Sequence, residues 1–150
     1  MEVALCGHAT LAAAFILFYH ENFKSDEVSF ESRSGKLTVK KNDEFLTMNF
    51  PADVIEKTPL TDELMSCFNK SPLEAYKGKT DYMLVFEKEE DISDIVYNID
   101  KISRIKARGV IITAPGKNSD FVSRFFAPQS GVNEDPVTGS AHTTLTPIRL

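Results

Sequence analysis

The fold is decided by the stretch Cys6-Gly7-His8-Ala9-Thr10-Leu11-Ala12-Ala13-Ala14-Phe15-Ile16-Leu17-Phe18. A glycine opens it, and the apolar residues that follow predict a helix over His8–His20 with almost no polar face. Such a helix is normally enclosed by other elements. The three consecutive alanines would let strands or another helix approach closely. The stretch therefore favours a sheet wrapped around a central apolar helix.

Strand patterns follow this helix. Val28–Glu31 and Lys36–Lys41 alternate between apolar and polar residues, and Ser34-Gly35 between them is typical of a hairpin turn. Glu44–Phe50 predicts a third strand, which Pro51 stops. This part of the chain thus predicts antiparallel hairpins.

The remaining chain predicts short helices and strands in a mixed order. Thr61 or Asp62 can cap a helix that runs to about Asn69. The other expected elements are a strand over Tyr82–Glu87, a solvated loop over Glu87–Asp91, a helix over Ile92–Ile105, strands over Val110–Thr113 and Phe121–Phe126, and a last helix near Gly139. The fold class is α+β, and Pro51–Leu60 is the only candidate boundary, so we expect two parts, residues 1–60 and 61–150.

Composition and charge exclude several classes of protein. The chain has 150 residues, of which 42% are hydrophobic and 26% charged, as in an ordinary globular protein. With a net charge of −5 and no basic patch, nucleic acid is not an expected partner. The longest apolar run, Leu11–Phe18, is too short to cross a bilayer, and Met1 and Glu2 give no cationic signal-peptide start. Two cysteines fit reduced thiols, so we expect a cytoplasmic protein.

A second glycine motif resembles the first. Thr138-Gly139-Ser140-Ala141-His142 follows the polar segment Gly131–Val137, and glycine and alanine hold the same places as in Cys6-Gly7-His8-Ala9-Thr10. Glycine lets a ligand approach the backbone, and a helix N-terminus presents unpaired N–H groups with partial positive charge. Two such helix starts facing each other would bind the carboxylate of a small anionic metabolite.

Four side chains in these motifs could take part in chemistry. His8 at a helix start is expected to be a neutral hydrogen-bond donor or proton relay, or else a partly buried histidine with a structural partner. Asp135 could bind a substrate amine or hydroxyl, or could bond its own backbone in a loop. Glu134 could be a base, but adjacent residues of an extended chain point in opposite directions, so at most one of the two faces the site. Ser140 is most simply a helix cap.

Other chemistries lack their motifs. No G-x-S-x-G elbow surrounds Ser140, and His142 is only two residues away, which disfavours a serine hydrolase. The three histidines fit no metal-ligand spacing, and neither a P-loop nor a dinucleotide fingerprint is present. We therefore expect neither a metal nor a cofactor.

Three segments closely resemble the signatures of the PhzF-like phenazine-biosynthesis family, and the resemblance runs over the whole chain. They are Leu5–Ala12, Ser123–Pro128 and Gly131–His142. The resemblance implies the diaminopimelate epimerase-like fold, in which two pseudo-symmetric halves each roll a sheet around a central helix, with the site in the cleft between them. Both halves would be incomplete in this chain. Members are cofactor-independent isomerases or epimerase-like proteins and are often dimeric, so the resemblance also allows a homodimer.

The resemblance also implies roles for individual residues. His8, Asp135 and Ser140 fall on the family's active-site positions. The best-understood member shifts a proton on a cyclic dihydro-hydroxy amino acid. The backbone amides of the two glycine turns would bind the substrate carboxylate. The residues concerned are Gly7 and Ala9 in the first turn and Gly139 and Ala141 in the second.

One departure bears on activity. The family's main acid/base glutamate lies in a Ser-Glu-Thr motif upstream of the Gly-His-Ala-Thr segment, and this motif is absent between Met1 and Gly7. The closing helix and last strands of the second half would also lie beyond Leu150. Proton transfer needs a base within hydrogen-bond reach of the acidic carbon. The expectation is a truncated family member that is weak or inactive alone.

Two alternatives stand beside this hypothesis. Cys6 occupies the place of one of two catalytic cysteines in related epimerases, but Thr138 at the matching place cannot supply a thiolate, which disfavours a cysteine-based racemase. The other alternative is a non-catalytic ligand-binding or structural protein. It predicts carboxylate binding that depends on Gly7 and Gly139, without solvent-deuterium exchange into any ligand.

Overall fold

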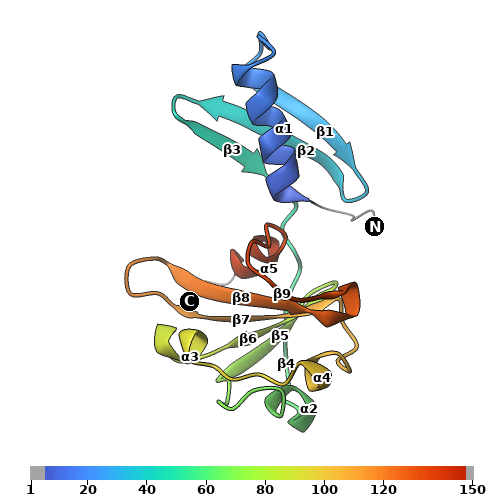
Figure 1. Cartoon of the computed structure of the whole chain (residues 1–150), viewed down its shortest axis with the longest axis vertical. Helices are drawn as coiled ribbons and strands as arrows, with labels where there is room; N and C mark the ends of the chain where they lie inside the picture. The colour runs from blue at the N-terminus through green and yellow to red at the C-terminus, as the bar shows by residue number, and fades with distance from the viewer. Residues whose placement is uncertain (1–5, 148–150) are drawn as a thin grey trace. The chain divides into compact units, whose positions relative to one another are not determined.

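The computed structural model describes residues 6–147, and the chain divides into two compact units, Met1–Ala52 and Asp53–Leu150 (Figure 1). Each unit has its own sheet and its own hydrophobic core. The predicted parts 1–60 and 61–150 refer to the halves of the family fold, and they stay a prediction. Within the described range, no helix is long and apolar enough to cross a lipid bilayer.

The described part of the first unit, residues 6–52, contains one helix and one three-stranded antiparallel sheet in the order β1-β2-β3. The elements are α1 (Gly7–Tyr19), β1 (Glu27–Ser32), β2 (Gly35–Asn42) and β3 (Phe45–Asn49). The predicted helix and hairpins are therefore confirmed. Gly35 has a φ of +102°, a conformation that L side chains rarely adopt, which explains why a glycine stands at the turn between β1 and β2.

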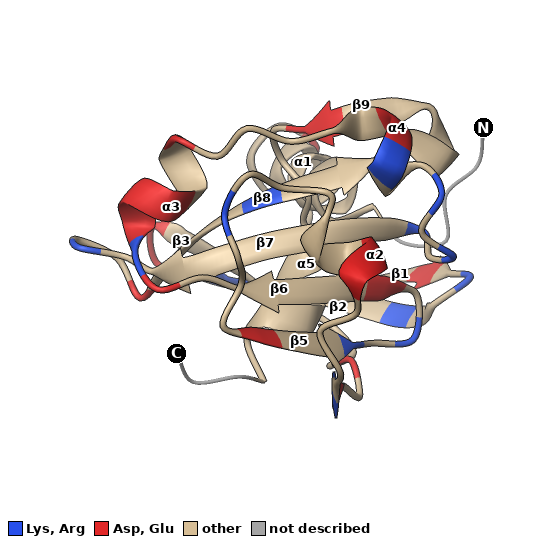
Figure 2. Ribbon diagram, turned by 90° about the horizontal axis from the view of Figure 1, so that it is seen from below, with Lys and Arg blue, Asp and Glu red and all other residues tan. Residues whose placement is uncertain are grey.

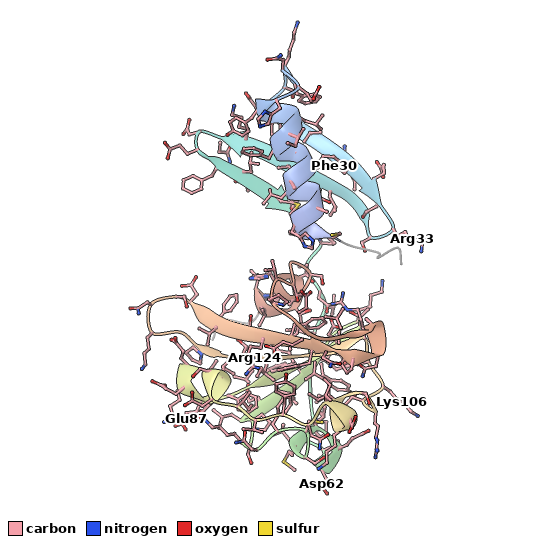
Figure 3. The ribbon with its side chains drawn as sticks, in the orientation of Figure 1. Phe30, Arg33, Asp62, Glu87, Lys106 and Arg124 are labelled. Atoms are coloured by element: carbon pink, nitrogen blue, oxygen red, sulfur yellow. The ribbon has the colours of Figure 1, made fainter. Side chains whose placement is uncertain are left out.

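One face of this sheet carries the core of the first unit. Ala14 and Phe18 of α1 pack with Val28 and Val39 of the strands, and Phe30 (labelled in Figure 3) is packed against this cluster. Alternation along the strands sends these apolar side chains to one face and the polar ones to the other. The sheet and α1 thus form two layers with a single core between them.

Among the described residues, α1 is covered on one side. Phe15, Ile16 and Tyr19 remain 43–47% exposed. Three strands can cover only one side of a helix that is about 10 Å wide with its side chains. The apolar sequence of α1 therefore leaves an uncovered apolar face in this unit.

The second unit contains a six-stranded sheet in the order β4-β5-β6-β7-β8-β9. Neighbouring strands are antiparallel except β6 and β7, which are parallel. The strands are β4 (Glu56–Thr58), β5 (Glu74–Lys77), β6 (Asp81–Val85), β7 (Gly109–Pro115), β8 (Phe121–Ala127) and β9 (Val132–Asp135). A 3-10 turn, η1 (Pro128–Ser130), joins β8 to β9.

Both faces of this sheet are covered. Val110 and Ile112 of β7 belong to one core cluster and Ile111 to another, as the two-residue period of a strand requires. The first cluster also holds residues of α2 (Asp62–Met65), α3 (Glu89–Ser93) and α4 (Ile99–Ile102). The second cluster holds residues of α5 (Ala141–Leu145). The acidic first turns of α2 and α3 are visible in red in Figure 2.

Several predicted elements of this unit differ from the structure. The single helix over Ile92–Ile105 is wrong, because Tyr97 forms a β-bridge with Phe68 and the Asn98 side chain caps a new helix by accepting from the Lys101 amide. The loop over Glu87–Asp91 is wrong in its second half, where acidic residues form the first turn of α3, as the helix dipole favours.

The helix predicted from Thr61 to Asn69 is shorter than expected. The Thr61 cap is confirmed, since its side chain accepts from the Leu64 amide, but the helix ends at Met65. The last helix begins at Ala141, close to the predicted start near Gly139. Strands β4, β5 and β9 are three to four residues long, and the sequence did not predict them.

Candidate functional site

The first glycine motif forms the start of α1. Cys6 occupies the N-cap position with extended backbone (φ −132°, ψ 92°), and its side chain makes no capping hydrogen bond. The Thr10 amide and hydroxyl both donate to the Cys6 carbonyl, at 3.2 and 2.9 Å. The first amides of a helix have no acceptor inside the helix. The helix therefore starts at Gly7 with backbone donors and no side-chain cap.

His8 is exposed in its unit, as is Ala9. The expectation of a partly buried histidine with a structural partner is therefore wrong for the described residues. Its Nε2 atom lies 3.7 Å from Cys6 Sγ. The imidazole and the thiol thus lie together beside the helix start, where both could meet a ligand.

The second motif begins at a bulge between β8 and β9. Asp135 is the register partner of Phe125, and the pairing shifts between Phe125 and Ala127. The Asp135 carboxylate accepts from the Thr138 hydroxyl at 2.7 Å and from the Val137 amide at 3.3 Å. Asp135 ends β9 and accepts from the backbone two residues on, and its role toward a substrate stays a prediction. These bonds also fix where its carboxylate points.

Glu134 has a different environment from its neighbour. Its carboxylate accepts two hydrogen bonds from Arg124, at 2.6 and 2.9 Å, and one from the Tyr97 hydroxyl at 3.3 Å. The hydrogen bonds from Arg124 lower the pKa of Glu134 and raise that of Arg124. Figure 3 labels Arg124 on β8. Glu134 is thus an ion-pair partner, and it is poorly placed to act as a base.

Asp135 borders a surface hollow of about 190 Å³ that follows the second motif. Glu134 does not line it, so of the two adjacent carboxylates Asp135 is the one that faces this hollow. The lining residues are Ser123, Arg124, Phe125, Asp135, Pro136, Val137, Thr138, Gly139, Ala141 and His142. Three of the expected site residues, Asp135, Gly139 and Ala141, therefore share one wall.

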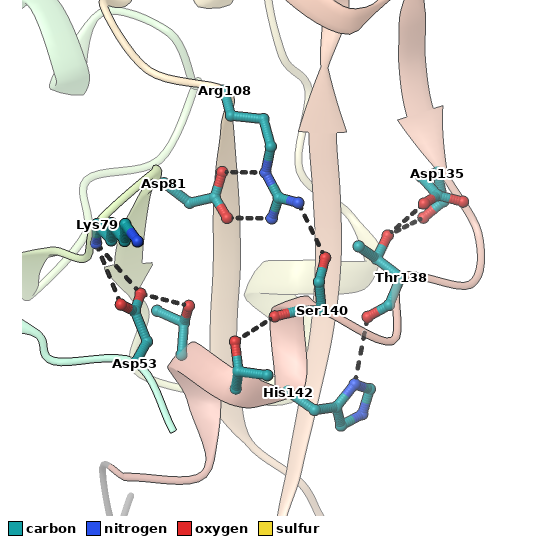
Figure 4. Close-up of polar contacts among 10 residues, drawn as sticks. Asp53, Lys79, Asp81, Arg108, Asp135, Thr138, Ser140 and His142 are labelled. Atoms are coloured by element: carbon teal, nitrogen blue, oxygen red, sulfur yellow. Dashed lines mark hydrogen bonds and ion pairs between the residues drawn. The ribbon is translucent and has the colours of Figure 1, made fainter. Parts of the chain in front are cut away.

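Ser140 makes a contact that the sequence did not predict (Figure 4). It occupies the N-cap position of α5 with helical backbone (φ −68°, ψ −20°), so its side chain makes no capping bond, and the expected cap is wrong. Instead, Arg108 Nη1 donates to Ser140 Oγ at 3.0 Å. His142 Nδ1 lies 3.3 Å from the Thr138 carbonyl. Serine and histidine here have separate partners, as the rejection of a hydrolase triad expected.

Backbone amides in the second motif are only partly free. The Ala141 amide donates to the Thr138 carbonyl at 3.1 Å, and the His142 amide to the Gly139 carbonyl at 3.2 Å. Within residues 6–147, no acceptor is found for the amides of Gly139 and Ser140. Those two N–H groups are therefore the donors that a ligand could reach.

Two charged side chains that contact α5, Arg108 and Asp53, were not predicted from the sequence. Arg108 forms an ion pair with Asp81, a carboxylate that is only 1% exposed. Asp53 accepts from the Lys79 amide at 3.2 Å and from the Thr144 hydroxyl at 3.1 Å. Asp81 and Arg108 lie at the starts of two parallel strands, because Asp81 is the register partner of Gly109. The sequence does show opposite charges at the starts of these two strands. They can be recognised as an ion pair only when β6 and β7 are known to be neighbours.

Comparison with known proteins decides the family. The family profile described as phenazine biosynthesis-like protein, PhzC-PhzF, matches residues 1–148. The chain belongs to this family. In the described part of this PhzC-PhzF chain, no group of three or more His, Cys, Asp or Glu side chains is arranged to hold a metal ion.

Relatives support the assignment. The chain is 47% identical over 148 residues to a Pseudomonas aeruginosa protein named an uncharacterized isomerase, covering 98% of this chain and 56% of the relative. A second Pseudomonas aeruginosa protein with that description is 42% identical over 147 residues, covering 98% and 56%. The chain therefore spans slightly more than half the length of these relatives.

Solved structures of PhzF-family proteins fix the fold. One from Enterococcus faecalis matches with a TM-score of 0.89 at 40% identity, and one from Clostridium difficile with 0.83 at 36% identity. Each match covers 97% of this chain and 56% of the solved chain. The α+β fold of this chain is thus the diaminopimelate epimerase-like fold of its family, as predicted.

Proposed function

We propose that this chain supplies the substrate-positioning part of a cofactor-independent isomerase that moves a proton on a small carboxylate-bearing metabolite. The observation that carries the proposal is the repeated glycine motif, which starts a helix in each unit and leaves backbone amides without acceptors. Family membership and two relatives named isomerases support the reaction class.

The residue roles follow from this chemistry. In the second unit, the free amides at Gly139 and Ser140 are proposed to bind a carboxylate without a lysine or arginine. In the first unit, the amides at Gly7 and Ala9 at the start of α1 are proposed as carboxylate donors of the same kind. The Ala141 amide is engaged in a turn, so this residue contributes the wall of the hollow instead. His8, exposed at the start of α1, is proposed to relay a proton to or from the substrate.

Asp135 orients the substrate by accepting from an amine or hydroxyl. Its carboxylate lines the hollow, and its bonds to Thr138 and to the Val137 amide hold it in place before a substrate arrives. A carboxylate fixed in this way loses little entropy on binding. Cyclic amino acids carry both the carboxylate and the amine that such a site requires.

The main proton carrier is proposed to lie outside residues 1–150, in a Ser-Glu-Thr segment upstream. The two carboxylates of the second motif support this proposal, since Glu134 is paired with Arg124 and Asp135 is engaged in its own turn. Without that glutamate the 150-residue chain would turn over weakly or not at all. Sequencing the coding DNA on both sides tests the proposal, and a stop codon close before Met1 would contradict it.

A deuterium wash-in experiment tests the function. The longest natural form of the protein is incubated in D₂O with proline, 4-hydroxyproline, pipecolate and cyclohexenecarboxylates, and incorporation is read by mass spectrometry. We expect exchange at the carbon next to the carboxylate, reduced at least about 100-fold by Asp135→Asn. His20→Gln, at the C-terminal end of α1, is the matched control for His8→Gln. Exchange that persists in both motif variants would overturn the assigned roles.

A second candidate function is carboxylate binding without catalysis. The observation that favours it is the engagement of both second-motif carboxylates in structural bonds. It predicts binding that is lost in Gly139→Val with no wash-in under any condition. A racemase based on Cys6 is disfavoured by Thr138 at the matching place, and loss of activity in Cys6→Ala would reverse that judgement.

Partner and location are proposed from the resemblance and the composition. We propose a cytoplasmic homodimer without nucleic-acid or membrane partners. Sedimentation velocity at micromolar concentration tests the dimer, and a monomer over the whole range would contradict it.

A further inference from the structure

The Ser140 hydroxyl contacts an arginine that is paired with a buried carboxylate. Arg108 Nη1 donates to Ser140 Oγ at 3.0 Å, while the same guanidinium binds both carboxylate oxygens of Asp81 (Figure 4). Ser140 itself is only 9% exposed. One guanidinium therefore joins the start of β6, the start of β7 and the start of α5.

Each end of this network is fixed by packing. Asp81 is 1% exposed, and its charge is compensated in its buried position by Arg108. The Arg108 amide donates to the Thr80 carbonyl at 2.8 Å, and the guanidinium carbon lies 5.2 Å from the centre of the Phe125 ring. A planar guanidinium that binds both oxygens of Asp81 cannot rotate away from Ser140 without breaking that pair.

The chemistry of the contact sets the role of the serine. An arginine side chain has donors only and stays protonated, so Ser140 Oγ can only accept from it. The hydroxyl proton must then point elsewhere. Among residues 6–147, no acceptor is found for that proton. Gly139 and Ala141 on either side of Ser140 both line the hollow.

We propose that Arg108, held by Asp81, is a positioning residue that makes the Ser140 hydroxyl an obligate hydrogen-bond donor toward the bound substrate. The proposal rests on the proposed function, since it assumes that a carboxylate-bearing ligand occupies this wall. A donor that is already oriented and polarised by a cation stabilises a developing negative charge more than a freely rotating hydroxyl does. Ser140 would then serve as a donor and not as a base.

A double-mutant cycle tests this inference. Arg108→Lys keeps the positive charge but cannot bind Asp81 in two places and reach Ser140 at once. We expect Ser140→Ala to slow wash-in about 100-fold and Arg108→Lys about 10-fold, mainly in kcat, with almost no further loss in the double variant. Arg104→Lys, an exposed arginine of the same unit, is the matched control and should leave the rate unchanged.

A second variant keeps the test usable if Arg108→Lys does not fold. Asp81→Asn leaves the guanidinium charged but removes one strong acceptor, and it should show the same lack of additivity with Ser140→Ala. Thermal melting confirms that each variant is folded before its rate is compared. Additive losses in both cycles would overturn the inference while the proposed function stands.

A binding measurement separates the two proposals. Pipecolate is titrated into the same set of proteins, and the Kd is obtained from the amide NMR shifts of Gly139 and Ser140. Binding with a non-additive cycle but without wash-in would support the inference and overturn the isomerase function. Absence of binding to the unmodified protein would overturn both.

Discussion

The sheet of the Asp53–Leu150 unit is covered on both faces, whereas the sheet of the Met1–Ala52 unit carries a single helix on one face. Phe126 in the second unit is fully buried, while Phe15 on α1 is 46% exposed. Yet both units present the same device, a glycine turn at the start of a helix. The same local motif thus occurs in two units that differ in how completely their sheets are covered.

The difference extends to how each motif is held. In the second unit, charged side chains fix α5 at both ends, with Arg108 at Ser140 and Asp53 at Thr144. At the start of α1, the contacts among residues 6–147 are the bonds from Thr10 to the Cys6 carbonyl and the contact between His8 and Cys6. We infer that the second motif is held in place before a ligand binds.

Paired phenylalanine truncations should give the largest contrast between the units. Phe126→Ala empties a closed core and should cost about 3–5 kcal/mol of unfolding free energy. Phe15→Ala removes a half-exposed ring and should cost less than about 1 kcal/mol. Urea unfolding of the 150-residue chain, followed by hydrogen exchange of amides in each unit, measures both. Equal costs would show that α1 is as enclosed as β8.

Alanine substitutions of one glycine in each unit should give a smaller difference in stability loss between the units. A Cβ at Gly109 would lie 2.5 Å from Phe125 Cζ and 2.7 Å from the Phe126 carbonyl oxygen, so Gly109→Ala should cost about 2–3 kcal/mol. Gly35 has open space around it but a φ of +102°, so Gly35→Ala should cost about 1 kcal/mol through backbone strain alone. Thermal melts compare the two. A larger loss at Gly35 would contradict the packing difference between the sheets.

The two units also differ in how well the sequence predicts them. In the first unit the strands pair with their neighbours in the chain, so alternation and the Ser34-Gly35 turn suffice. In the second unit β6 pairs in parallel with β7 across the intervening helices, and short strands such as β4 and β9 show no clear alternation. The apolar periodicity of Ile92–Ile105 marks Ile92, Ile95 and Ile102 correctly as buried, but Val96 is 65% exposed. The pattern does not reveal the break at Tyr97.

In the candidate site, too, contacts between residues close in the chain are easier to predict than contacts between distant ones. The motif residues Asp135 and Gly139 could be identified because they are close together in the chain. The partner of Ser140 could not, since Arg108 lies 32 positions away and reaches the serine only through the parallel pairing of β6 and β7. Residues that a fold brings together over such distances need a correct strand order before their charges can be interpreted.

The Glu134 ion pair gives a pH-dependent contrast within the second unit. The pKa of Glu134 is lowered by the hydrogen bond from Arg124, so its contribution to stability is present above the pKa of the unfolded chain. It is lost as the pH falls through the lowered pKa of the folded state. Glu134→Gln should therefore cost about 1–2 kcal/mol at pH 7 and progressively less in acid. Urea titrations from pH 2.5 to 7 measure it, and a constant difference would contradict the ion pair.

The two cysteines, one in each unit, allow the opening of each unit to be compared through the reactivity of its thiol. Cys67 is 1% exposed, its thiol donates to the Glu63 carbonyl, and burial raises its pKa, so the thiolate that would react is suppressed. Cys6 is partly exposed at the start of α1. A thiol reagent should therefore modify Cys6 in the native protein and Cys67 only when the second unit opens. Phe126→Ala should accelerate the labelling of Cys67 and leave that of Cys6 unchanged, because opening of a core is governed by its own free energy. Equal acceleration at both thiols would mean that the two units open together.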